Sequence, residues 1–377
     1  MISATDSLNF DNIYFHDNFN STRISIRNKG ETPMRILGCD VGTGNLGGVI
    51  VSTSDSKQGK KEIRRVKDAF FKIDVSNVIG GAESSFGENV LKQAGANYIK
   101  IDGALYVLGD DAFKFANLFH SECLRPMAKG VLNPSQPMSA VMLKELIRGI
   151  IGECSCKEDV LYFCVPAAPV DGEFNIIYHT DMLKSIFLSL GYENVGVMNE
   201  GLAVIFSELQ SEAYTGVGLS AGSGMVNVCY AFMGIPVFSF SIPRCGDWID
   251  ENVATATNDT KAAVQAVKEA GVDLTSPKGN AETAIAIYYN AMLENIVRQF
   301  KGIYERTPKK DLPNISAPLT LAVAGGTSLA GGFIDRLTPM VTSKTFPVPI
   351  SRVVHAKEPL MAIASGLCTA ALISKKK

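Results

Sequence analysis

Two glycine-rich turns carry the residue types that can bind phosphate groups. The first is Asp40-Val41-Gly42-Thr43-Gly44-Asn45, and the second is Ser220-Ala221-Gly222-Ser223-Gly224. Backbone amides in such turns can approach a crowded, multiply charged polyphosphate where side chains cannot. Asp40 stands beside the first turn and could hold Mg²⁺ through water, because magnesium keeps much of its hydration shell. Either turn alone is equally consistent with simple punctuation between two strands.

A third turn has a different character. Ala324-Gly325-Gly326-Thr327-Ser328 follows an apolar run and precedes a predicted helix. A Gly-Gly step permits close approach of a flat base or a sugar. Three such turns in one chain indicate a nucleotide site more strongly than any one of them does.

The elements around these turns predict an α/β fold. Residues 35–53 read as strand, turn and strand, and residues 216–242 repeat that layout with a further turn and strand. The shared layout suggests an internal duplication. Apolar residues at helical spacing predict helices over 139–152, 179–191, 200–210, most of 251–310 with a break at 274–280, and the C-terminal 359–377.

Composition excludes several classes of protein. The chain has 377 residues, 46% of them hydrophobic, which is enough for two domains. Its formal net charge of -2 gives no strong field toward nucleic acid, so no nucleic-acid partner is expected. Residues 1–34 lack an apolar signal core, and no apolar run reaches the ~18 residues of a spanning helix. A cytoplasmic protein without direct membrane insertion is therefore expected.

The eight cysteines fit a reducing compartment. Most lie in apolar runs, as Cys164 and Cys229 do, and are expected to be small buried hydrophobes. Cys154 and Cys156 form a C-S-C pair, but no second Cys or His pair follows at metal-binding spacing. No zinc site is expected.

Taken together, these segments resemble the actin-like ATPase superfamily, which includes actins, DnaK-type chaperones and sugar kinases. The greatest similarity is to bacterial filament proteins of the MreB and MamK type. The resemblance spans residues 35–372. It is carried by Asp40–Asn45, the spacer from Tyr106 to Leu132, Asn199-Glu200-Gly201-Leu202-Ala203, residues 218–250 with their Gly246-Asp247-Trp248-Ile249-Asp250 tail, Val267-Lys268-Glu269, Gly325-Gly326-Thr327-Ser328 with Gly332–Leu337, and Pro359 and Gly366.

The resemblance implies two related actin-like lobes with a duplicated RNase H-like core and a nucleotide cleft between them. Lobe I would comprise residues 35–197 and 351–377, with a small subdomain inserted at about 60–120. Lobe II would comprise residues 198–350, with an insertion at about 251–317. Residues 1–34 are polar and are expected to form a disordered arm. Their aromatic residues leave a docking tail open as the alternative.

The resemblance also implies roles for individual residues. Glu200 would position or activate the water that attacks the γ-phosphate of ATP, and Asp40 would hold Mg²⁺ through water. The residues that would bind ATP or ADP are Gly42, Thr43, Gly44, Asn45, Gly222, Ser223 and Gly224 at the phosphates, Lys268 and Glu269 at the nucleoside, and Gly325, Gly326, Thr327 and Ser328 at the adenosine. Without its neighbours, Glu200 would be read as an exposed acid favoured by the dipole of a helix N-terminus.

The chain departs from the family pattern beside the second turn. Ser220 stands where relatives have an aspartate that helps to hold the metal and its water, and a hydroxyl offers no charge. Gly201 replaces the common proline of the connecting segment. We therefore expect ATP binding to be retained and hydrolysis to be slow.

Three functions are compatible with these residues. The first is a cytoskeletal ATPase that forms a head-to-tail homopolymer, with a possible filament-binding adaptor as a further partner. The second, suggested by Ser220, is a non-hydrolysing adaptor or static filament. The third is a small-molecule kinase, which would need an acidic base beside a substrate cleft. Asp110 and Asp111 are the candidates for that base, although their segment reads as a loop.

Overall fold

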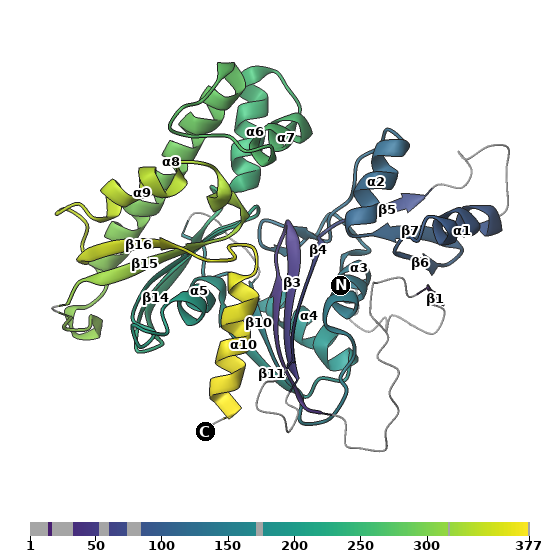
Figure 1. Ribbon diagram of the computed structural model, residues 1–377, viewed down its shortest axis with the longest axis horizontal. Helices are drawn as coiled ribbons and strands as arrows, with labels where there is room; N and C mark the ends of the chain where they lie inside the picture. Colours follow the sequence, from purple (N-terminus) through teal and green to yellow (C-terminus); the bar gives the residue numbers. More distant parts are fainter. Residues whose placement is uncertain are drawn as a thin grey trace, which may run out of the picture.

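The structure is a computed structural model that describes residues 14–16, 33–52, 60–73, 84–170, 176–315 and 317–375. Two five-stranded sheets stand side by side, with helices between them and on their outer faces (Figure 1). This confirms the predicted α/β fold with two related lobes. The predicted arm at residues 1–34 lies outside the described residues, except for β1 (Tyr14–His16) and the two residues before β2.

The first sheet has the strand order β11-β10-β2-β3-β4. Its strands are β2 (Arg35–Val41), β3 (Asn45–Ser52), β4 (Lys60–Lys67), β10 (Val160–Val165) and β11 (Asn194–Asn199). Alternate residues of β2 face opposite sides, as strand geometry requires. Leu37 and Cys39 pack toward α3 (Ser139–Ile151) and α4 (Ile176–Ser189), whereas Ile36 packs against α10 (Ala362–Lys375).

The second sheet repeats the first. Its strands are β12 (Gly216–Ala221), β13 (Val226–Phe232), β14 (Ile235–Ile242), β15 (Leu319–Ala324) and β16 (Ile350–His355). In both sheets, three strands pair in parallel and two more extend from them in antiparallel hairpins. This common topology supports the predicted duplication. Because β16 pairs with β15, residues 350–355 belong to the second sheet, whereas the sequence division assigned residues 351–377 to lobe I.

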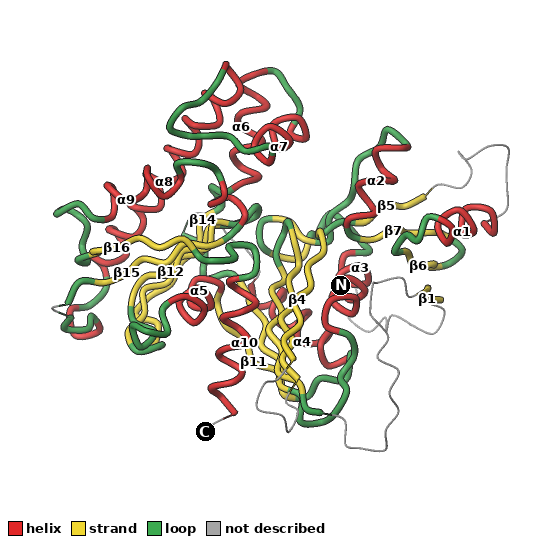
Figure 2. The backbone as a smooth tube through the Cα atoms, viewed as in Figure 1, coloured by secondary structure: helices red, strands yellow, loops and turns green. Residues whose placement is uncertain are grey.

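Two helices fill the space between the sheets, and glycines let them approach closely. α5 (Glu200–Glu208) packs against α10 (Figure 2) and against strands of the second sheet. A Cβ at Gly366 of α10 would overlap the carbonyl oxygen of Ala203 in α5, and a Cβ at Gly38 would overlap that of Ala364. A Cβ at Gly201 of α5 would lie 2.7 Å from the backbone nitrogen of Cys229 in the second sheet. Backbone contacts therefore set the distance between the lobes.

Each lobe also carries a smaller unit beside its sheet. In the first lobe it contains the sheet β1-β6-β7-β5 and two helices, with a short hairpin following: β5 (Phe70–Ile73), α1 (Ser84–Gln93), β6 (Tyr98–Ile101), β7 (Ala104–Leu108), α2 (Asp110–Leu118), β8 (Met127–Ala128) and β9 (Val131–Leu132). In the second lobe the smaller unit consists of α6 (Gly246–Thr257), α7 (Lys261–Glu269) and the start of α8 (Gly279–Arg306), whereas α9 (Phe333–Val341) packs on β16 of the sheet. Two 3-10 turns, Lys309–Asp311 and Gly326–Leu329, complete the described chain. None of the described helices is long and apolar enough to cross a membrane.

The α5–α10 contact generates a stability prediction. We expect Gly366→Ala to lower the free energy of unfolding by about 1–3 kcal/mol or more, because the added methyl must displace backbone in a packed core. Gly302→Ala is the matched control: it lies in α8, where the nearest atoms to an added Cβ belong to the mobile end of Arg306 at 3.6 Å. For Gly302→Ala we expect the free energy of unfolding to rise by about 0.5–1 kcal/mol, because alanine has a higher helix propensity than glycine. Urea titrations measure both, and equal effects would contradict the close contact.

Candidate functional site

The two glycine-rich turns have the same shape. Gly42 N donates to Asn45 O at 3.2 Å, and Gly222 N donates to Met225 O at 3.0 Å. A Cβ at either glycine would lie 2.9 Å from the carbonyl oxygen that closes the turn. Each turn joins the first two strands of its lobe, so the duplication places both at equivalent edges of the sheets.

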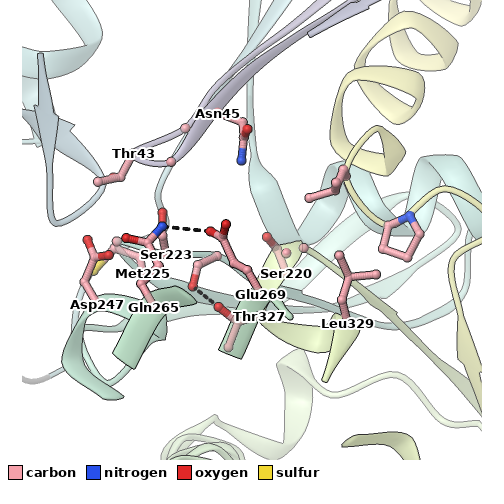
Figure 3. A pocket seen from close by; sticks show the side chains of 18 of the residues that line it. Thr43, Asn45, Ser220, Ser223, Met225, Asp247, Gln265, Glu269, Thr327 and Leu329 are labelled. Carbon is pink, nitrogen blue, oxygen red and sulfur yellow. Dashed lines mark hydrogen bonds between the residues drawn. The ribbon is translucent and has the colours of Figure 1, made fainter. Parts of the chain in front are cut away.

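These two hairpins face each other and touch across the cleft. A Cβ on Gly44 would lie 2.6 Å from Ser223 Oγ, and a Cβ on Gly224 would overlap Thr43. Thr43 is itself fixed, because its Oγ1 accepts a hydrogen bond of 2.9 Å from Gly130 N. Figure 3 shows Thr43 and Ser223 on opposite sides of the opening. The two turns can therefore present their amides to a single ligand.

A cavity of about 340 Å³ opens beside the hairpins and gathers most of the predicted site residues. Its lining includes Asp40, Gly42, Thr43, Gly44, Asn45, Glu200, Gly222, Ser223, Gly224, Lys268, Glu269, Gly325, Gly326 and Thr327. Segments up to 287 residues apart thus meet in one place. The hydroxyl of Thr327 donates to Gly222 O at 2.8 Å, which ties the third turn to the second.

Ser328 is the predicted site residue that does not line this cavity. It is 1% exposed, and its hydroxyl donates to Gly325 O at 2.6 Å. The hydroxyl oxygen of Ser328 also lies 2.9 Å from His355 Nε2. Ser328 therefore supports the Gly-Gly turn from behind.

Two carboxylates, Asp40 and Glu200, line the cavity. Glu200 is the first residue of α5, whose N-terminus is capped by Asn199 accepting from Leu202 N at 2.9 Å. Ser220 Oγ donates to Glu200 Oε2 at 3.1 Å, and Cys164 Sγ donates to Asp40 Oδ1 at 3.1 Å.

Burial raises the pKa of both acids, and the charge of Asp40 raises the pKa of Glu200 further. The hydrogen bonds from Cys164 and Ser220 oppose these increases without cancelling them. A cation brought into the cavity would relieve the cost of ionising both groups. Asp40 and Glu200 are therefore the carboxylates of this lining that could hold a water-bridged Mg²⁺.

Lys268 lines the cavity with its charge already balanced. Its Nζ lies 2.8 Å from Asp250 Oδ2 and 3.0 Å from Gly246 O, and the pair is nearly buried. Glu269 accepts a 2.7 Å hydrogen bond from Gln265 Nε2 (Figure 3). Of these side chains, Gln265 and Glu269 are thus better placed than Lys268 to exchange hydrogen bonds with a ligand.

Two ion pairs cross the cleft, and the sequence assigned no role to them. Arg125 Nη1, from the segment between α2 and β8, lies 3.3 Å from Asp247 Oδ1 in the first turn of α6. Lys67 Nζ at the end of β4 lies 3.8 Å from Glu269 Oε1. Arg125 and Asp247 both lie in segments that resemble the family, and this resemblance is the one sequence feature that could have pointed to them.

The buried acids predict an unusual pH dependence of stability. A carboxyl whose pKa is raised by folding stabilises the protein fully below the unfolded-state pKa, and that contribution is lost as pH rises through the folded-state pKa. Glu200→Gln removes this loss of stability. At pH 8 we therefore expect the free energy of unfolding of the variant to exceed that of the parent protein by about 1–3 kcal/mol. One pKa unit corresponds to about 1.4 kcal/mol. Near pH 4 the gain should vanish, and thermal unfolding from pH 4 to 8.5 without ligand measures it.

Asp159 supplies a control of the opposite sign. Burial alone would raise its pKa, but hydrogen bonds from Arg35 and Ser155 outweigh burial and hold it well below the usual value. Asp159→Asn should therefore destabilise the protein at neutral pH, with the difference shrinking as pH falls. Parallel curves for the two variants would contradict the assignment of Glu200.

No curated protein matches this chain. Among solved structures it is similar to one titled "MamK double helical filament", with a TM-score of 0.65 and 16% identity over 90% of this chain and 99% of that one. It is also similar to MreB5 of Spiroplasma citri bound to AMPPNP, with a TM-score of 0.61 and 15% identity over 91% and 97% of the two chains. The ADP-bound form of MreB5 gives a TM-score of 0.58 at 15% identity over 92% and 98%.

These similarities confirm the actin-like, two-lobed fold that the sequence predicted. A protein-family model described as Volactin matches residues 35–371, which is most of the chain. The protein therefore belongs to the Volactin family.

Proposed function

We propose that this protein binds ATP between its lobes, polymerises head to tail into cytoskeletal filaments, and hydrolyses Mg-ATP slowly. The observation that carries the proposal is the contact of two equivalent glycine turns beside one cavity. Both turns offer backbone amides, which suit a polyphosphate. The related fold of a protein whose structure is titled a filament, and of another bound to AMPPNP and ADP, adds support.

The residues divide the work as follows. Amides of residues 42–45 and 222–224 hold the phosphates, and Gly325, Gly326 and Thr327 accept the nucleoside, with Glu269 and Gln265 beside it. Asp40 would hold Mg²⁺ through water, and the ion would supply positive charge beside the phosphates. Glu200 orients the attacking water and accepts its proton. Phosphoryl transfer depends mainly on such positioning and charge neutralisation.

Slow turnover follows from Ser220. Its hydroxyl is used as a donor to Glu200 and brings no negative charge to the metal side of the cavity. The same observation supports a static filament or adaptor as the second candidate.

A kinase of the same superfamily has less support. Asp110 and Asp111 begin helix α2, whereas the sequence suggested a loop. Asp111 accepts from Asn97 N at 3.0 Å and pairs with Lys114, so it is engaged in local structure away from the cavity. An acidic base for a second substrate is not offered by these two residues.

Calorimetry with Mg-ATP tests the binding proposal. We expect saturable binding, weakened at least tenfold in Gly224→Ala, because the new methyl would push the second hairpin away from Thr43 and Gly130. Gly302→Ala should bind like the parent protein. Absence of binding by the parent protein at high concentration would reject the proposal.

The filament proposal is tested on the same protein by sedimentation and electron microscopy. ATP and a non-hydrolysable analogue should both produce pelletable polymer, with slow phosphate release from ATP only. Polymer with both nucleotides and no phosphate release would favour the static filament. No polymer under any condition would reject assembly while leaving nucleotide binding intact.

The Arg125–Asp247 pair predicts how fast nucleotide leaves. Both side chains are about a quarter exposed, so we expect a coupling of about 0.2–1 kcal/mol and release roughly 1.4- to fivefold faster in Arg125→Gln or Asp247→Asn. The double variant should be no faster than either single one. Stopped-flow release of a fluorescent ATP analogue measures the rates. The differences should fade at 1 M salt, where the Debye length is about 3 Å, and additive effects would contradict coupling across the cleft.

A further inference from the structure

The outer face of α4 carries a stripe of four exposed side chains that no part of the nucleotide site uses. The α4 stripe consists of Ile177, Asp181, Lys184 and Leu188. Ile177 is 78% exposed and Leu188 is 58% exposed, so both ends of the stripe offer apolar surface. Among the described residues, neither Asp181 nor Lys184 takes part in an ion pair.

Helical geometry places these four residues in one line. Their spacing of i, i+4, i+7 and i+11 keeps them within a narrow strip along the helix. The opposite face is buried through Leu183, Ile186 and Phe187, which pack into the core of the first lobe. α4 lies on the side of the first sheet away from α10 and the second lobe (Figure 1), so the stripe faces outward from a rigid support.

The order of side chains along the stripe is self-complementary under reversal. Ile177 and Leu188 are equidistant from its centre, and so are Asp181 and Lys184. When a second α4 is laid against it antiparallel, Ile177 meets Leu188 of the other copy, and Asp181 meets Lys184 twice. A parallel arrangement would instead set Asp181 against Asp181 and Lys184 against Lys184. Charge complementarity therefore selects the two-fold antiparallel arrangement.

We propose that α4 is a lateral self-association surface, on which a second copy of this chain docks antiparallel across a two-fold axis. The occupant is another copy because one helix supplies both halves of the complementary pattern. A single helix face buries much less than the ~800 Å² per partner of a stable interface, so each contact is weak on its own. This inference rests on the proposed polymer for its strength, because a filament repeats the contact and multiplies the avidity. In such a polymer, contacts between copies of α4 would hold two filament strands together in antiparallel orientation.

Charge reversal tests the proposal with an internal rescue. Asp181→Lys and Lys184→Asp should each separate paired strands into single ones, since every two-fold contact then sets like charges together. The double variant Asp181→Lys/Lys184→Asp restores complementarity and should restore pairing. Glu305→Lys, an exposed reversal on α8 of the other lobe, should leave pairing unchanged. Electron microscopy counts strands, and sedimentation with Mg-ATP reports polymer mass separately.

These two readouts separate the proposals. Single strands in the reversal variants at unchanged polymer mass support the α4 contact. Strands that stay paired in both single reversals, or a double variant that stays unpaired, overturn it. Loss of polymer in the parent protein would reject the filament, and the pairing would then be decided by cross-linking.

Cross-linking does not require a filament. A carbodiimide joins a carboxylate to an amine in direct contact, so it should link Asp181 to Lys184 between copies. Mixing ¹⁴N- and ¹⁵N-labelled protein at high concentration distinguishes links between chains from links within a helix by mass spectrometry. Mixed-isotope peptides joining residue 181 to residue 184, absent from Asp181→Asn, support the proposal. Links within single chains only would overturn it.

Discussion

The contact between the β2–β3 and β12–β13 hairpins sets the spacing on which the site depends. It leaves no room for a Cβ at Gly44 or Gly224, because the side chains of Ser223 and Thr43 pack directly on these glycines. At the other end of the cleft, Gly366 of α10 packs on the backbone of α5. Such close-packed contacts leave little room for compression, and interiors transmit strain. The lobes are therefore held at a distance fixed at two points, and the cavity between those points has a defined width.

The electrostatics of the cavity follow from that spacing. Holding the lobes together brings Asp40 from one lobe within the field of Glu200, at the start of the helix that connects to the other, while burial removes the water that would solvate them. Ionised acids in such a place need a cation. Ser220 bears on this balance, because an aspartate there would set a third carboxylate where a hydroxyl now donates to Glu200 at 3.1 Å. The serine therefore eases repulsion among the acids when no metal is bound, and it offers less attraction for a metal than an aspartate would.

How far the sequence foretold the structure depends on the range of each interaction. Gly42 and Gly222 were predictable because a tight turn between two strands is local, and the duplication was visible in its repeated layout. Ser328 was placed in the site with its neighbours, yet in a 3-10 turn adjacent side chains point in different directions, and this one points toward His355. Lys268 was expected at the nucleoside, and its partner Asp250, 18 residues earlier, shows its charge committed elsewhere. The Arg125–Asp247 pair joins the two lobes. It could not be predicted, because no local sequence pattern encodes the position of one lobe relative to the other.

The layering of the molecule separates two kinds of constraint. α5 and α10, between the sheets, contact backbone on both sides, so their small residues are dictated by packing. α4, on the outside, has one face dictated by the core of the first lobe and the other exposed. Substitution on that outer face leaves the hairpins and the cavity untouched, because Leu183 and Phe187 hold the helix in place from beneath. An actin-like chain can in this way vary how its copies associate laterally while the glycines of the inner layer keep the cleft at a fixed width.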